Sequence, residues 1–273
     1  EAVYPQKGFM QKGDDMYDEP LAIADMVWGI HRWKSNYAKQ TINYVSCHDN
    51  WTLRDQLYNT VHDGRPASIE EIMRASIASH ALVFASNATA FMLGGEELFR
   101  TKEVTMDVID DCLENTYTQL HSHYISHNSY NSPAKVNTFK WDNKVAVTLD
   151  DQTITDEEFH YGDAFKKLVR LHDEMPKISL SNNQTGHFPE NKTSAGKEYG
   201  NLSWGGKNGG CLGIQFDEWF IYVFSKVEDG FIYGDASFFN DEHKKFEYGY
   251  QSIDESQLIH NGNRFAIGIY YRG

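Results

Sequence analysis

An adjacent histidine and aspartate, His48 and Asp49, follow an apolar segment that ends at Cys47. A carboxylate in this place can stabilise a developing cation, and an imidazole can hydrogen-bond a hydroxyl group of a ligand. The same two side chains can instead cap the end of a strand and hydrogen-bond the loop that follows. Spacing alone favours this structural role over the chemical one.

Two other clusters hold side chains that could bind a metal ion. One is a set of three histidines: His121, His123 and His127. The other is a set of acidic residues that could take Ca²⁺: Asp107, Asp110, Asp111 and Glu114. No cysteine or carboxylate completes the histidine set at a familiar spacing, which favours a solvated polar loop. The acidic set is more typical of a solvated helix face, so we expect no metal and no cofactor.

A strand–helix–strand unit must position His48 and Asp49. β-favouring side chains predict a strand over residues 41–47, and apolar side chains at helical spacing predict a helix over residues 68–86. A short apolar strand over residues 90–93 follows. In such a unit the strands run parallel, so the polar residues after each strand lie at one edge, where active sites form in a (β/α)8 barrel.

The remaining chain predicts a second domain. Residues 1–39 indicate a long loop with a short helix, and residues 98–162 a long polar loop before a helix over residues 165–172 that is stopped by Pro176. Alternating aromatic and aliphatic runs then predict antiparallel strands over residues 212–216, 219–224, 231–233, 246–250 and 265–271. We therefore expect domains at residues 1–176 and 177–273.

Composition narrows the classes of partner. The net charge of −14 makes nucleic acid and anionic membranes poor partners, because like charges repel. No apolar run is long enough to span a membrane. Aromatic residues make up 14% of the chain, and their flat faces can stack on sugar rings or fill a β-rich core. Three cysteines without metal-binding spacing need no disulfide, which slightly favours a cytoplasmic location and leaves an extracellular one open.

Three sequence blocks resemble one family. Residues 44–53, Tyr-Val-Ser-Cys-His-Asp-Asn-Trp-Thr-Leu, are similar to the fourth sequence region of the α-amylase superfamily (glycoside hydrolase family 13), and look closest to its type I pullulanase branch. Residues 91–102, Phe-Met-Leu-Gly-Gly-Glu-Glu-Leu-Phe-Arg-Thr-Lys, resemble that family's segment at the eighth barrel strand. Residues 128–133, Asn-Ser-Tyr-Asn-Ser-Pro, resemble the substrate loop after it.

The resemblance implies a fold and a set of site residues. The fold would be the C-terminal part of a (β/α)8 TIM barrel, with its last two strands and helices, followed by an antiparallel β-sandwich domain. Asp49 matches the aspartate that stabilises the transition state, and His48 matches the histidine that binds hydroxyls of the sugar at the cleavage point. Positions at or near the cleft match Asn50, Trp51, Glu97, Arg100, Tyr130 and Asn131.

The resemblance also implies a function, hydrolysis of α-1,6 branch points in α-glucans with retention of configuration. Such enzymes need a nucleophile and a general acid. Only 48 residues precede Asp49, and no Phe-Arg-Phe-Asp-like segment occurs, so we expect both groups to be absent and the chain to be inactive alone. The expected partners are an α-glucan and either the missing part of the barrel or a second copy of the chain.

Three departures leave alternatives open, and one of them is the stretch Glu103–His127, which is longer than the family's usual loop. Cys47 stands where the family more often has Lys or Ala, and Ala134 stands where pullulanases usually have an Asp that helps to hold the terminal sugar. The chain could therefore be a non-catalytic glucan-binding or pseudo-enzyme module. An assembly fragment without a ligand is the third hypothesis.

Overall fold

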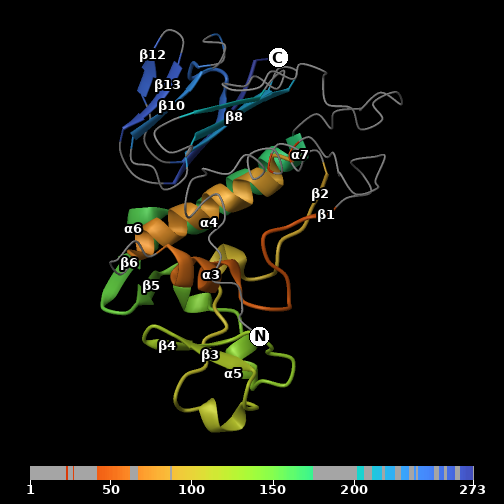
Figure 1. Ribbon diagram of the computed structural model, residues 1–273, viewed down its shortest axis with the longest axis vertical. Helices are drawn as coiled ribbons and strands as arrows, with labels where there is room; N and C mark the ends of the chain where they lie inside the picture. Colours follow the sequence, from red (N-terminus) through yellow and green to blue (C-terminus); the bar gives the residue numbers. More distant parts are fainter. Residues whose placement is uncertain are drawn as a thin grey trace. The chain divides into compact units, whose positions relative to one another are not determined.

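Figure 1 shows the computed structural model of the chain, which describes residues 23, 27, 42–61, 67–86, 88–174, 202–205, 211–216, 219–224, 229–233, 237, 239–248, 252–254, 257–261 and 265–272. The described residues group into two compact units. The first holds those of Tyr44–Ile77 and Met92–Lys166, and the second includes those of Ala78–Phe91 and Lys167–Gly273. Apart from Ile23 and Val27, which are helical, the predicted N-terminal loop lies outside the described residues, and so does the predicted domain boundary at 177.

Two short parallel strands confirm the predicted strand–helix–strand unit. Strand β1 (Ile42–Asn43) pairs in parallel with β2 (Thr89–Ala90), and α4 (Ile69–Phe84) lies between them in the chain. The predicted strand over residues 41–47 is too long, because the chain leaves the ladder after Asn43, and the predicted strand over residues 90–93 is observed only at Thr89–Ala90. Beyond Asn43 the chain makes hydrogen bonds to other segments in place of a neighbouring strand. The Ser46 hydroxyl donates to Glu96, and the His48 carbonyl accepts from Lys102.

Helix α4 begins where the sequence predicts. The Glu71 carboxylate accepts a hydrogen bond from the Ser68 backbone N–H at 3.2 Å, and the Glu71 N–H donates to the Ser68 hydroxyl at 3.1 Å. This capping box satisfies two N–H groups that the helix leaves unpaired. The helix is apolar on most sides, and Ile69, Ile72 and Ile77 are fully buried.

A second long helix also confirms its prediction. Helix α7 (Tyr161–Glu174) covers the predicted helix over residues 165–172, while Pro176 lies outside the described residues. The hydroxyls of Tyr161 and Ser76 are 2.8 Å apart, and Nδ1 of His172 lies 2.6 Å from the carbonyl oxygen of Phe84. Both bonds join α7 to α4.

The prediction of a long loop over residues 98–162 is wrong. Two antiparallel hairpins occupy much of it: β3 (Tyr117–Leu120) with β4 (His123–Ser126), and β5 (Ala146–Leu149) with β6 (Gln152–Thr155). Short helices fill most of the rest: η2 (Glu96–Leu98), η3 (Ile109–Asp111), α5 (Ala134–Asn137), η4 (Trp141–Lys144) and α6 (Asp156–Phe159). Each hairpin turns through two residues, and the first of the two has a left-handed backbone. This residue is His121 in the first hairpin, with φ 52°, and Asp150 in the second, with φ 53°. Such turns usually carry Asn-Gly or Asp-Gly, and neither pair is present to mark these two.

The C-terminal strands confirm the predicted antiparallel β-structure. A five-stranded sheet has the order β11 (Lys244–Tyr248), β14 (Ala266–Tyr271), β9 (Trp219–Phe224), β8 (Cys211–Phe216) and β7 (Leu202–Gly205). A three-stranded sheet has the order β10 (Asp229–Tyr233), β13 (Gln257–Asn261) and β12 (Ser252–Asp254). Every residue of β9 is buried, and a Cβ at Gly268 would lie 2.0 Å from the ring of Tyr222, so only glycine fits there. Among the described residues, no helix is long and apolar enough to cross a membrane.

Candidate functional site

The site begins at the amino end of α3 (Leu53–Thr60), a helix that the sequence analysis missed. Thr52 caps this helix, since its hydroxyl accepts a hydrogen bond from the N–H of Asp55 at 3.3 Å. The Asp55 carboxylate is fully buried and accepts hydrogen bonds from the Thr101 hydroxyl at 2.6 Å and from the Lys102 N–H at 2.9 Å. Asp55 therefore ties the start of α3 to residues 101–102.

Lys102 supports the loop that carries the predicted catalytic residue. Its side chain is 1% exposed, and its ammonium donates hydrogen bonds to the carbonyl oxygens of His48 at 2.5 Å and Asn50 at 2.6 Å. Asn50 has a left-handed backbone, with φ 60°. Burial lowers the pKa of Lys102, and the nearby Arg100 lowers it further, while the charge of Asp55 opposes both effects.

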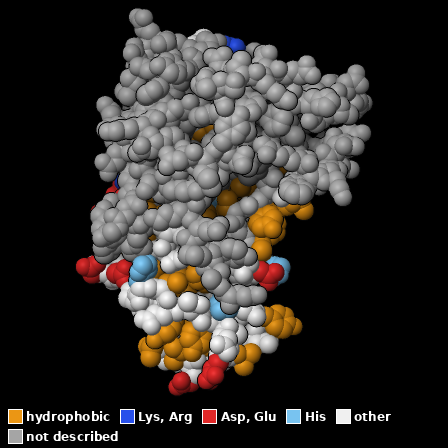
Figure 2. Space-filling model, viewed as in Figure 1, with side chains coloured by type: hydrophobic (Ala, Val, Ile, Leu, Met, Phe, Trp, Pro, Cys, Tyr) orange, Lys and Arg blue, Asp and Glu red, His pale blue; other side chains and the backbone are white. Residues whose placement is uncertain are grey.

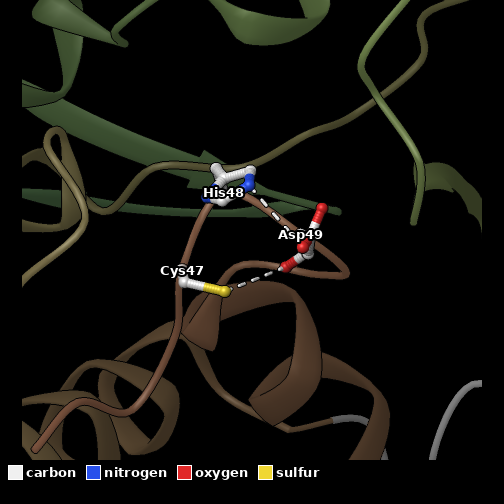
Figure 3. Close-up of side chains that lie close together, drawn as sticks. All are labelled: Cys47, His48 and Asp49. Carbon is white, nitrogen blue, oxygen red and sulfur yellow. Dashed lines mark hydrogen bonds and ion pairs between the residues drawn. The ribbon is translucent and has the colours of Figure 1, made fainter. Parts of the chain in front are cut away.

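His48 and Asp49 project from this loop into solvent. Their side chains are 84% and 74% exposed, and His48 Nε2 lies 3.6 Å from Asp49 Oδ2. Figure 3 shows the two side chains close together, with Cys47 beside them on the same loop. The Cys47 thiol donates a weak, long hydrogen bond to the backbone carbonyl of Asp49, at 3.9 Å. The backbone of the loop is therefore held by Lys102, while the side chains of His48 and Asp49 are accessible to a ligand.

These side chains line a cavity of about 470 Å³. Its walls are formed by His48, Asp49, Arg100, Lys102, Asn128, Ser129, Tyr130 and Asn137. The three sequence blocks at residues 44–53, 91–102 and 128–133 all contribute to it. The volume lies within the range of small-ligand sites, which is roughly 300–1,000 Å³.

Arg100 forms a rigid part of the wall. It is 9% exposed, and its guanidinium donates to the carbonyl oxygens of Gly94 at 2.6 Å and Asn137 at 3.0 Å. The guanidinium carbon also lies 5.3 Å from the ring centre of Phe139, within the range of a cation–π contact. Burial lowers the pKa of Arg100, and the neighbouring carboxylate of Glu96 counteracts this effect.

An aromatic side chain stands open at the same cavity. Hydrophobic side chains reach the surface of the described residues (Figure 2), and Tyr130 is the most exposed of the large ones described, at 90%. The loop that carries it is held by Asn137, whose side-chain amide donates to the Ser129 carbonyl at 2.8 Å. Tyr130 can therefore stack on a ligand without a loss of packing.

The other predicted ligand contacts lie elsewhere. Trp51 is 2% exposed and is not part of the cavity wall, because it is buried at the start of α3. Glu97 accepts a hydrogen bond from the Gly95 N–H at 2.9 Å and holds that turn. Asn50 contributes its carbonyl to Lys102. Asn131 lines a neighbouring cavity of about 50 Å³.

Sequence reasoning missed a buried carboxyl group behind the loop. Glu96 is 1% exposed and accepts hydrogen bonds from the Ser46 hydroxyl and from the Leu53 N–H, the latter at 3.3 Å. Burial raises the pKa of Glu96 to about 7, although the hydrogen bond from Ser46 opposes the shift. The Gly-Glu-Glu block marks this residue, but its pattern does not distinguish the buried glutamate from the partly exposed one.

His123 is part of a polar network and does not join the other two histidines in a metal site. Its Nδ1 lies 2.6 Å from Glu103 Oε1, and its Nε2 lies 3.1 Å from Asp150 Oδ1. Asp150 also accepts a hydrogen bond from the Ser122 hydroxyl at 2.5 Å. The hydrogen bond with Glu103 raises the pKa of His123, and burial partly counteracts it. The network joins the two hairpins.

In the acidic cluster, the carboxylate of Asp107 forms an ion pair with Lys135, with 2.7 Å between Lys135 Nζ and Asp107 Oδ2.

Comparison with known proteins identifies the fold. No protein-family model matches the chain. The pullulanase SAP of group B Streptococcus matches with a TM-score of 0.69 and 16% identity, over 100% of this chain and 37% of that one. This is a pullulanase-like fold. The catalytic module of the pneumococcal glycogen-degrading virulence factor SpuA matches with a TM-score of 0.63 and 16% identity, over 98% of this chain and 41% of that one. The pullulanase of Bacillus acidopullulyticus matches with a TM-score of 0.60 and 19% identity, over 98% and 28%.

The pullulanase-like fold confirms the predicted resemblance. At sequence identities of 16–19%, the similarity to these structures shows the fold. The chain spans 28–41% of their length. Within that fold the cavity holds a single carboxylate among the described residues that line it, that of Asp49.

Proposed function

We propose that the chain is a portion of a glycoside hydrolase that acts on α-1,6 branch points of α-glucans, with Asp49 as its transition-state-stabilising carboxylate. The observation that carries this proposal is the cavity that the three sequence blocks build together around His48 and Asp49. The reaction passes through an oxocarbenium-like transition state. The carboxylate of Asp49, on a loop whose backbone Lys102 holds, can stabilise that charge.

The neighbouring side chains suit a neutral sugar. His48 hydrogen-bonds hydroxyls of the ring at the cleavage point, and the side-chain amides of Asn128 and Asn137 offer both donors and acceptors. Tyr130 supplies a flat apolar face on which a pyranose ring stacks. Similar structures support this choice of ligand, since the pullulanase SAP has been solved in complex with maltotetraose.

The chain alone is inactive under this proposal. A retaining glycosidase needs two carboxyl groups about 5–5.5 Å apart beside the scissile bond. The cavity wall, as far as it is described, carries only Asp49. The nucleophile and the general acid come from a part of the hydrolase that this chain does not contain.

The same proposal assigns the architecture. Strand β1, helix α4, strand β2 and helix α7 are the last two strand–helix pairs of a (β/α)8 barrel, within a domain at residues 1–176. The two antiparallel sheets form a sandwich domain at residues 177–273. Two strands cannot close an eight-stranded barrel, so the rest of the barrel, or a second copy of the chain, covers the open edges.

One observation favours a second function, glucan binding without catalysis. Ala134, the exposed first residue of α5, stands where the resemblance to pullulanases implies an aspartate that helps to hold the terminal sugar. Loss of that carboxylate weakens one subsite and leaves the cavity intact.

Two assays on the full chain test the proposal. Calorimetric titration with maltotetraose gives one site per chain, and Tyr130→Ala weakens it at least tenfold while Asp107→Asn, a matched exposed change away from the cavity, leaves it unaltered. Incubation with pullulan releases no reducing sugar. Release that disappears in Asp49→Asn contradicts the claim of missing carboxylates, and the absence of any maltotetraose binding contradicts the proposed ligand.

A further inference from the structure

Three different metal-binding groups meet at the exposed loop. Cys47, His48 and Asp49 each offer one ligand atom, and these atoms lie within 4.8 Å of one another (Figure 3). This is the one such group of three found among the described residues. His48 and Asp49 are exposed and Cys47 is partly exposed, so their side chains can reorient without a loss of packing.

The distances suit a tetrahedral ion. Zinc bonds of about 2.0–2.3 Å to nitrogen, oxygen and sulfur place the ligand atoms of a tetrahedral site about 3.3–3.6 Å apart. His48 Nε2 and Asp49 Oδ2 already lie 3.6 Å apart. The Cys47 sulfur lies within 4.8 Å of both atoms, so a side-chain rotation of Cys47 has to bring it closer, and water fills the fourth position of the open site.

We propose that Cys47, His48 and Asp49 form a binding site for Zn²⁺ or a similar thiophilic divalent cation. The donor set selects the metal: thiolate and imidazole favour zinc, whereas Ca²⁺ and Mg²⁺ require oxygen ligands in larger number. A thiolate and a carboxylate together carry two negative charges, which neutralise the ion. The site departs from the expectation of no metal, because its ligands are a single cysteine and its two neighbours in the sequence and not a spaced set of cysteines or histidines.

A buried cation, the ammonium of Lys102, lies near the proposed metal site. The buried ammonium of Lys102 is close enough for Asp49 and Cys47 to influence its pKa. The same ammonium repels a metal ion, but its protons are already directed at the carbonyl oxygens of His48 and Asn50. The site therefore binds zinc with moderate affinity, below that of a closed structural site.

Zinc bound at this site would compete with the sugar, an inference that rests on the proposed function. Zinc would engage the same His48 and Asp49 side chains that face the sugar, so the two ligands exclude each other. Because coupling between two ligands is reciprocal, maltotetraose weakens zinc binding by the same factor by which zinc weakens the binding of maltotetraose.

Zinc titration of the full chain tests the site directly. Calorimetry under a non-thiol reductant gives one Zn²⁺ per chain, and Co²⁺ gives a near-ultraviolet thiolate-to-cobalt absorption band. Cys47→Ser abolishes the band and lowers zinc affinity at least tenfold, whereas Cys112→Ala, which alters a buried thiol elsewhere, changes neither. Circular dichroism verifies that both variants fold. Equal zinc affinity in the wild type and Cys47→Ser overturns the site.

A second titration separates this proposal from the proposed function. Maltotetraose is titrated with and without saturating Zn²⁺, and the expected result is at least a tenfold loss of sugar affinity that Cys47→Ser relieves. Unchanged sugar affinity in the presence of bound zinc overturns the exclusion. A failure of maltotetraose to bind in either condition refutes the proposed function, while the zinc titration alone still decides the metal site.

Discussion

The ammonium group of Lys102 donates a hydrogen bond of 2.5 Å to the backbone carbonyl of His48. A buried charge of the first compact unit thus fixes the backbone of an exposed loop that lies 54 residues earlier in the chain. Asp55 completes the support, because its carboxylate accepts a hydrogen bond from the Lys102 N–H at the start of α3. The position of Asp49 therefore depends on two buried charged residues, Lys102 and Asp55.

Lys102→Met removes both carbonyl contacts of the ammonium. Hydrogen bonds to charged groups contribute about 1.5–3 kcal/mol each, so the loss of two is expected to lower the free energy of unfolding by roughly 3–6 kcal/mol. Urea denaturation measures it. Lys135→Met is the matched control, since Lys135 pairs with Asp107 at the surface and its loss leaves stability nearly unchanged. Similar effects of the two substitutions would refute the role of Lys102 as a support.

Asp55→Asn tests the other support. The amide keeps the shape of the side chain but loses the charge that faces Arg54 Nη1 at 3.1 Å, and it gains two donors where only acceptors fit. Breaking a buried ion pair costs about 3–5 kcal/mol. Thermal and urea unfolding measure the loss, and Asp163→Asn in an exposed pair with Lys166 serves as the control. A loss no larger than that of the control contradicts the assignment.

Glu96 makes stability depend on pH. Its pKa is raised from 4.5 to about 7, so the folded chain binds a proton that the unfolded chain releases in that interval. The stabilisation by this proton is complete below pH 4.5, and it is lost as pH rises to 7, by about 3 kcal/mol at most. Glu96→Gln cannot titrate. The difference in unfolding free energy between wild type and Glu96→Gln should therefore change across pH 4.5–7, and a constant difference would show that Glu96 is charged throughout.

The stability of the two hairpins should depend on pH through His123. Its pKa is raised above 6.5, so its contribution is complete below pH 6.5 and disappears as pH rises through the folded value. The pKa of Glu103 and that of Asp150 are lowered from 4.5 and 3.8, so their contributions are lost as pH falls. We expect faster amide hydrogen exchange of β3 and β4 at about pH 9 than at about pH 6, after correction for the intrinsic rate. His123→Gln should abolish this difference, whereas His127→Gln should keep it.

Strong periodic patterns made much of the fold predictable. Apolar side chains at helical spacing located α4, and alternation located β8, β9 and β14. The hairpins escaped because His121 and Asp150 adopt left-handed turns without a glycine beside them. Helix α3 escaped because it is short and mostly polar, although Thr52 and Asp55 mark its start.

The candidate site was predictable only in part. The three blocks named His48, Asp49, Arg100 and Tyr130, which line one cavity in the structure. They could not show that Trp51 points inward, since an aromatic beside a polar motif fits either environment. Lys102 was overlooked because lysine is almost never fully buried, and only the structure shows the two carbonyl groups that compensate its burial.

The location of a bound glucan tests the central claim most directly. Amide chemical-shift changes in the isotope-labelled full chain are mapped during titration with maltotetraose. The account predicts that the largest changes fall on His48, Asp49, Asn128 and Tyr130, and that they weaken in Tyr130→Ala. Changes confined to the strands of the C-terminal sheets, or no changes at all, would contradict the assignment of this cavity to an α-glucan.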